Sequence, residues 1–375
     1  MTEAQPEKRV SWAELFFDLV FVFAITEVSE LVHENHSWFG VLRALTVFVP
    51  LYWTWVGASM QANLRDLGPI RYRLALFAVG LTGLFMALAV PAAYGERGLL
   101  FATSYWVGRL LLAGIAFAGR GRRSNPPFLI AAVVSGPLLV IGGVLDGPAR
   151  LALWAIAAVI DLAAPTLTRA RLRALHFDAP HLTERFGLLV LIALGESVVA
   201  IGAPAAAEHE LSAGVLGAVA AAFALSCGLW WVYFQYAQDA MRFSMATAQV
   251  QNDVARHVLS YAHLSFVGAI IAAAVGMREA VAHPGEHLNW AVTGLLYGGA
   301  ALYLATFGYT RWQMFRLVST TRLAAAGVVL ALLPIAPFLP ALAALVLLAA
   351  ALAALNAIEH RRVRKAELAA AEQAG

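Results

Sequence analysis

The chain has 375 residues, of which 61% are hydrophobic and only 13% are charged, whereas a soluble domain carries roughly 25% charged residues. The net charge is only +3, and the basic residues lie between apolar runs, which argues against a nucleic-acid partner. The single cysteine, Cys227, excludes an intramolecular disulfide and a cysteine metal cluster. Composition therefore predicts an all-α, polytopic integral membrane protein in contact with the lipid bilayer.

The hydropathy pattern predicts about 12 transmembrane helices, since a span needs about 20 mainly apolar residues. Such runs lie near residues 12–32, 38–60, 71–92, 98–117, 127–145, 149–167, 183–203, 211–237, 254–276, 288–309, 320–336 and 338–357. Pro334, Pro337 and Pro340 interrupt the last pair, and proline ends or kinks a helix. Residues 320–357 therefore form either two spans or one broken helix.

The placement of basic residues predicts the orientation, because cytoplasmic loops collect Lys and Arg. With the N-terminus inside, 21 of the 26 basic residues fall in inner segments, among them Arg120, Arg122 and Arg123. Both termini are then cytoplasmic. The expected organisation is a cytoplasmic N-terminus, a first six-helix half, a cytoplasmic linker, a second six-helix half and a cytoplasmic tail, over residues 1–11, 12–167, 168–182, 183–357 and 358–375.

The two halves carry the trace of an internal repeat. The segment Glu-Leu-Phe-Phe-Asp-Leu-Val at 14–20 can be aligned with Glu-Arg-Phe-Gly-Leu-Leu-Val at 184–190. The copies are separated by an even number of spans, so both enter the membrane in the same sense. This favours a 6+6 parallel repeat about an axis along the membrane normal, a plan found in some transporters.

The first predicted span contains acids that a bilayer disfavours, and such groups often mark functional sites. Glu14 forms a capping-box pattern with Ser11, so a helix cap and a functional role are both open for it. Asp18 lies one turn deeper on the same helix face. Its expected partner is Arg185 or Arg256, both near the same inner end.

Two further glutamates lie deeper. Glu27 is about 20 Å beyond Glu14 along the helix axis, and Glu196 is about 18 Å beyond Glu184, at 1.5 Å per residue. We hypothesise that Glu27 and Glu196 form a central proton- or cation-binding site, with Asp18 and Glu14 at its cytoplasmic mouth. The alternative is that Glu27 extends to the outer interface and that both acids only support packing.

Other polar groups at depth are candidates for supporting roles. Arg109 and Asp161 either form one buried ion pair that fixes packing, or Arg109 pairs with Glu27 or Glu196.

In the ninth span, Asp253, His257 and Tyr261 share one face, and a histidine can relay protons near neutral pH. His181 and Glu184 stand three residues apart at the start of the seventh span. No His-x-x-x-His pair on one face of a predicted span and no repeated Glu-x-x-His motif is present, so the sequence predicts neither a metal nor a cofactor.

Two sequence blocks carry a family resemblance. Trp12-x-Glu14-Leu-Phe-Phe-Asp18-Leu-Val-Phe and His181-Leu-Thr-Glu-Arg-Phe-Gly, which runs on to Leu194-Gly-Glu-Ser-Val198, resemble the hallmarks of the low temperature requirement A (LtrA) family of bacterial membrane proteins. The resemblance implies a bacterial inner (plasma) membrane protein with a role in growth in the cold. It leaves the molecular activity open.

Three functions are compatible with these features. The first is a transporter or channel for a small solute or ion, favoured by the repeat, the buried acids and the lack of a Walker, nucleophile-elbow or zinc-protease motif. The second is a membrane-embedded enzyme acting on a lipid or isoprenoid. The third is a structural or signalling protein. No catalytic residue is assigned, and the oligomeric state, a homodimer included, is left open.

Overall fold

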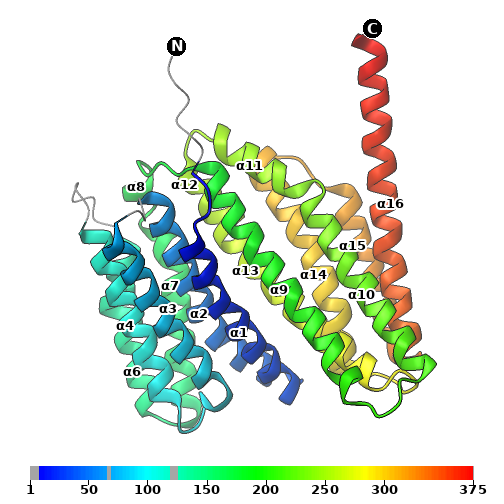
Figure 1. Ribbon diagram of the computed structural model, residues 1–375, viewed down its shortest axis with the longest axis horizontal. Coiled ribbons are helices and arrows are strands. Elements are labelled where there is room, and N and C mark those ends of the chain that lie inside the picture. Colours follow the sequence, from blue (N-terminus) through cyan, green and yellow to red (C-terminus); the bar gives the residue numbers. More distant parts are fainter. Residues whose placement is uncertain (1–7, 66–68, 119–125, 375) are drawn as a thin grey trace. The chain divides into compact units, whose positions relative to one another are not determined.

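In the computed structural model of the chain, every regular element is a helix within the residues that the structure describes, 8–65, 69–118 and 126–374 (Figure 1). The predicted all-α class is therefore confirmed. Residues 1–7 and the basic residues Arg120, Arg122 and Arg123, which were used to predict the topology, lie outside the described residues.

The chain divides into two compact units, of which the first comprises Met1–Ile192 and Met241–Leu264. Its helices up to residue 172 are α1 (Trp12–Glu34), α2 (Trp38–Leu64), α3 (Ile70–Ala89) with η1 (Val90–Ala92), α4 (Gly98–Phe117), α5 (Pro126–Ile130) with η2 (Ala131–Ser135) and α6 (Gly136–Val144), α7 (Gly147–Leu167) and α8 (Arg169–Leu172). The π-helical segment η2 joins α5 and α6 into one continuous run.

The second unit comprises Ala193–Ala240 and Ser265–Gly375. It contains α10 (Ala213–Phe234), α14 (Trp290–Phe315), α15 (Thr320–Leu332), η4 (Ala336–Phe338) and α16 (Ala341–Ala374). Three helices have residues in both units: α9 (Ala179–Ala207), α11 (Ala237–Thr247) and α13 (Ala262–Ala282). The short α12 (Gln251–Val254) and the π-helix η3 (Ala255–Tyr261) lead into α13.

Ten helices in the described part of the chain are long and apolar enough to cross a membrane. Two of the twelve predicted spans do not meet that description: α1, with its acidic residues, and α15, which has only 13 residues. The count of twelve and the repeat therefore stay predictions. Residues 320–357 form two helices, and the three prolines lie in the break between them.

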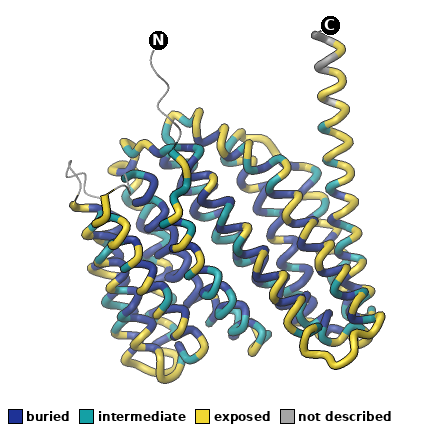
Figure 2. Tube along the Cα trace, viewed as in Figure 1, coloured by how far each residue is buried: buried dark blue, intermediate teal, exposed yellow. Residues whose placement is uncertain are grey.

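The outward surface of the first unit has the character expected of a lipid-facing one. On α3, Leu74, Phe77, Leu81, Phe85 and Leu88 are all exposed, and their spacing of three or four residues places them on one helix face. Figure 2 shows the buried residues on the inward faces of the helices. A continuous apolar stripe is costly in water and favourable in a bilayer, so the packing agrees with a polytopic membrane protein.

Within the second unit, α13 and α14 approach closely at a glycine. A Cβ atom on Gly299 would lie 2.7 Å from the Ala269 carbonyl oxygen and 2.8 Å from the Ala273 nitrogen, both backbone atoms. A Cβ atom on the adjacent Gly298 would have no described atom of another helix within 4 Å. Small residues allow helix backbones in membranes to pack at short range, and of these two neighbouring glycines Gly299 is the one at the contact.

Candidate functional site

The two sequence blocks meet in the first unit through an ion pair between residues 167 positions apart. Arg185 donates from Nη1 to Asp18 Oδ2 at 2.9 Å and from Nη2 to Asp18 Oδ1 at 2.8 Å. Arg185 is fully buried and Asp18 is 2% exposed. Two parallel bonds between a guanidinium and a carboxylate are the strongest arrangement available to such a pair. Of the two partners predicted for Asp18, Arg185 is therefore the one that the structure contains.

Helix α2 completes the surroundings of this pair. Trp55 Nε1 donates to Asp18 Oδ1 at 2.8 Å, and Arg185 Nη2 donates to Ser59 Oγ at 3.1 Å. The Arg185 guanidinium carbon lies 5.5 Å from the centre of the Trp55 ring. Asp18 thus accepts three hydrogen bonds, which is how a buried carboxylate is stabilised away from water.

Glu14 serves two purposes at the start of α1. Its Oε2 accepts hydrogen bonds from the Ser11 amide at 2.9 Å and the Ser11 hydroxyl at 2.8 Å, which confirms the capping box. Its Oε1 lies 3.0 Å from His181 Nε2 and 3.9 Å from Arg185 Nε. Glu14, Asp18, His181 and Arg185, all buried, form one cluster, which we call the signature network.

The hydrogen bonds of Asn63 decide which nitrogen of His181 carries the proton. The backbone N–H of Asp178 donates to Asn63 Oδ1 at 3.0 Å. This bond identifies the side-chain oxygen of Asn63, and the side-chain nitrogen donates to the Asp178 carbonyl at 2.9 Å. That nitrogen also lies 2.9 Å from His181 Nδ1, which must accept. His181 therefore directs a protonated Nε2 toward Glu14.

The second buried cluster confirms the predicted pairing of Arg109 with Asp161. Arg109 Nη2 lies 3.2 Å from Asp161 Oδ2, and Arg109 Nε donates to the Tyr105 hydroxyl at 2.9 Å. Tyr105 donates in turn to Asp161 Oδ2, and Arg109 Nη1 donates to the Trp53 carbonyl at 3.2 Å. The cluster joins α2, α4 and α7, and of the partners predicted for Arg109 the structure contains Asp161.

The third cluster surrounds Asp253. Arg169 donates to its two oxygens from Nε and Nη2 at 2.8 and 2.6 Å, and Arg256 Nη2 donates to Oδ1 at 3.1 Å. The hydrogen bond with Asp253 raises the pKa of Arg169 above its ordinary value. Arg256 Nη2 also lies 2.9 Å from His257 Nε2, and the His257 and Tyr261 rings, both in η3, are 5.8 Å apart.

The remaining predicted residues occupy different surroundings. Glu27 is half-buried in the first unit, and Glu196 is 5% exposed in the second. Glu184 is exposed, although Glu14, its counterpart in the proposed repeat, is buried. The hypothesis that Glu27 and Glu196 form one central site stays a prediction.

Sequence reasoning missed the contribution of α2. Trp55, Ser59 and Asn63 stand at i, i+4 and i+8, so they share one helix face. Polar or hydrogen-bonding groups repeated at that spacing in an otherwise apolar span indicate a buried polar partner. The pattern was therefore available as a signal for the network.

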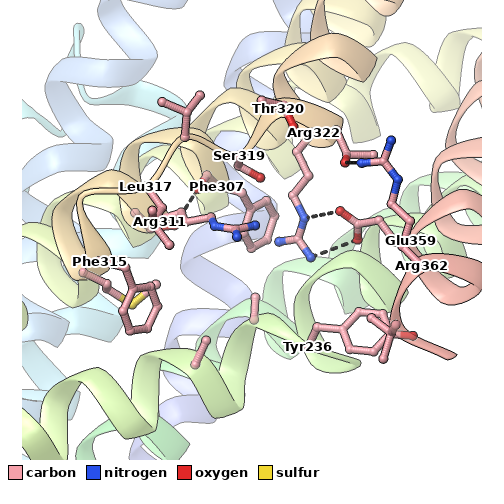
Figure 3. A pocket seen from close by; sticks show the side chains of 17 residues that line it. Tyr236, Phe307, Arg311, Phe315, Leu317, Ser319, Thr320, Arg322, Glu359 and Arg362 are labelled. Atoms are coloured by element: carbon pink, nitrogen blue, oxygen red, sulfur yellow. Dashed lines mark hydrogen bonds and ion pairs between the residues drawn. The ribbon is translucent and has the colours of Figure 1, made fainter. Parts of the chain in front are cut away.

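The second unit contains a cavity of about 520 Å³ beside α15 and α16, shown in Figure 3. Arg322 donates from Nε and Nη2 to the two oxygens of Glu359 at 2.8 and 3.0 Å, and its guanidinium carbon lies 4.5 Å from the centre of the Phe307 ring. Arg362 Nη1 donates to Thr321 Oγ1 at 2.6 Å. These bonds connect α15 to α16.

The chain is similar to known proteins over most of its length. The family model described as bacterial low temperature requirement A protein (LtrA) matches residues 9–357. An uncharacterized protein of Rhizobium meliloti (strain 1021) is 33% identical over 323 residues, which cover 81% of this chain and 77% of that protein. No solved structure matches the chain.

Proposed function

This chain belongs to the bacterial low temperature requirement A family, and we propose that it acts as a transporter or channel for a small solute or ion. The proposal places it in the bacterial inner (plasma) membrane with both termini cytoplasmic. It retains twelve spans, with α1 and α15 included, and the 6+6 parallel repeat. No enzymatic step is part of it.

The observation that supports this function best is the contact between Glu14 and His181. Glu14 Oε1 lies 3.0 Å from His181 Nε2, so a buried carboxylate that can take up and release a proton faces a polar ring group on α9. Ionisable groups within membrane spans are characteristic of ion pathways and proton relays. This contact joins the two sequence blocks that resemble the hallmarks of the family.

The proposal gives the members of the signature network different roles. Asp18 and Arg185 position α1 and α9 through their two parallel hydrogen bonds. Glu14 accepts and releases the proton, and His181 lies beside its carboxylate. Glu27 and Glu196 provide the deeper proton- or cation-binding groups, since ionisable side chains within membrane spans mark ion pathways, and Glu196 is buried.

Purified protein in proteoliposomes tests this function. In the first assay, an internal pH-sensitive dye reports proton flux while a potassium gradient with valinomycin sets the membrane potential. In a second assay, without valinomycin, external Na⁺ or K⁺ tests cation movement. We expect proton flux above that of empty vesicles. Glu14→Gln retains the shape of the cap but cannot ionise, so it should slow the flux at least tenfold, and Glu196→Gln should do the same.

Glu184→Gln is the matched control, because it neutralises an exposed acid on α9 next to Arg185. Its flux should equal that of the parent. The proposal is wrong if the parent protein moves neither protons, Na⁺ nor K⁺ faster than empty vesicles. If flux is present but Glu14→Gln and Glu196→Gln retain the full rate, these acids do not lie on the ion path.

A further inference from the structure

A second cavity of about 80 Å³ lies within the first unit, between α2 and the α12–η3 segment. Most of its wall is apolar, with Trp53, Met60 and Phe128 among the larger side chains. Arg256 and Asn252 also line it. Among the described residues that line it, none is acidic.

The polar groups in this wall are donors that lack acceptors. Arg256 is 5% exposed and Asn252 is 6% exposed. Within the described part of the chain, Nε and Nη1 of Arg256 and Nδ2 of Asn252 are buried without a hydrogen-bond partner. Each buried donor left unpaired carries the cost of its lost hydration, and that cost is larger when the donor is charged. A ligand that brings acceptor atoms would remove that cost.

The charge balance indicates that the acceptor is an anion. Asp253 is shared between the guanidinium groups of Arg169 and Arg256. The other arginine in the cavity wall, Arg109, is already compensated by Asp161. Two positive groups and one carboxylate leave one positive charge beside the cavity. Water could fill a space of this size and supply acceptors, but only an anion also neutralises the charge.

The backbone presents these donors through an unusual helical segment. Asn252 and Arg256 stand four residues apart, where α12 passes into the π-helix η3. The Ser260 hydroxyl donates to the Ala255 carbonyl five residues earlier, at 3.0 Å, so this polar group of the wall is satisfied. π-Helical turns are rare and occur frequently at functional sites.

We propose that this cavity binds a small organic monoanion, a carboxylate with a short apolar body. The carboxylate accepts from Arg256 and Asn252, and the apolar body contacts Trp53, Met60 and Phe128. The volume is too small for a whole lipid. The proposal goes beyond the transport function and does not need it, since it concerns equilibrium binding by residues outside the signature network.

Binding can be measured on the full chain in detergent, with sodium butyrate as the probe. Tryptophan fluorescence and the thermal unfolding temperature are followed during a titration at constant ionic strength. Butyramide has nearly the same shape but no charge, and sodium chloride supplies an inorganic anion. We expect saturable stabilisation by butyrate, none by butyramide, and at least tenfold weaker binding of chloride.

Two variants localise the site. Arg256→Gln should weaken butyrate binding at least tenfold, and it leaves Asp253 bonded to Arg169, so the protein keeps its fold. Arg171→Gln is the matched control, because it removes an exposed guanidinium on α8 that is not part of the cavity wall, and its butyrate affinity should stay within twofold of the parent. Asn252→Ala removes an amide nitrogen that bonds to no described protein atom, and it should weaken binding severalfold without lowering stability.

The proposal is overturned if butyramide stabilises the protein as much as butyrate does, or if chloride binds as tightly as butyrate. It is equally overturned if folded Arg256→Gln retains the parent affinity. Should Arg256→Gln not fold, Asn252→Ala decides, and an unchanged butyrate affinity in that variant contradicts the site.

Discussion

Replacing Asp18 by leucine should be one of the most destabilising single changes in the first unit. The substitution leaves the guanidinium of Arg185, which is fully buried, without its two parallel hydrogen bonds. It also removes the acceptor of the Trp55 indole N–H. The closest remaining carboxylate oxygen of the signature network is that of Glu14, at 3.9 Å from Arg185 Nε.

The magnitude follows from these lost contacts. Removing one partner of a buried ion pair costs about 3–5 kcal/mol, because the other charge stays buried and uncompensated. An unpaired buried donor costs roughly 1–3 kcal/mol, and the Trp55 indole N–H adds part of that cost. The loss of the ion pair and the loss of the indole hydrogen bond both arise from the same carboxylate, so the two costs are not additive. We therefore expect Asp18→Leu to lower the free energy of unfolding by at least about 3 kcal/mol.

A second substitution separates the ion pair from simple packing. Arg185→Met in the Asp18→Leu background removes the uncompensated charge, and apolar replacement of a complete buried pair is often neutral. The double variant should therefore be more stable than either single variant, with a coupling energy of at least about 2 kcal/mol.

Unfolding by sodium dodecyl sulfate in mixed micelles, followed by tryptophan fluorescence, measures this cycle. Glu184→Leu is the control, because Glu184 is exposed on α9, the helix that carries Arg185. Its free energy of unfolding should stay within about 0.5 kcal/mol of that of the parent. The reasoning is refuted if the losses of the two single variants simply add in the double variant.

Three further predictions concern other parts of the chain. Arg109→Ala should destabilise by about 3–5 kcal/mol, and Asp161→Asn in that background should restore part of the loss in the same unfolding assay; equal stability of Arg109→Ala and the parent would show that the pair has no net role. Gly299→Ala should lower the unfolding temperature, because overpacking costs about 1–3 kcal/mol, whereas Gly298→Ala should leave it unchanged or raise it; a reversed order would contradict the α13–α14 contact. Reporter fusions at residue 375 should be cytoplasmic, and an external reporter would overturn the orientation inferred from the basic residues.

The helices could be predicted from the sequence because each depends on local composition. The apolar runs and the prolines between α15 and α16 determine where the chain can be helical and where it must break. The capping box at Ser11 and Glu14 is likewise a local pattern. These features need no knowledge of which helices are neighbours.

The partners of the buried charges could not be predicted in the same way. Arg185 and Arg256 were equally good partners for Asp18, and only the packing of α9 beside α1 and α2 distinguishes them. The proposed repeat also aligns Glu14 with Glu184, but Glu14 is buried and Glu184 is exposed. Similar helices in a repeat do not imply similar surroundings, since each side chain responds to the neighbours that its own helix acquires.

The π-helical geometry of η3 has an evolutionary consequence. An α-helix advances about 100° per residue, so removing one residue from the wide turns of residues 255–261 and restoring a regular helix would rotate α12 by about that angle relative to α13. Asn252 would then leave the cavity wall, while α13 and the helices after it would keep their places. One deleted codon would therefore remove this donor arrangement, and because Asp253 also lies on α12, it would disturb the Arg169–Asp253 bonds as well.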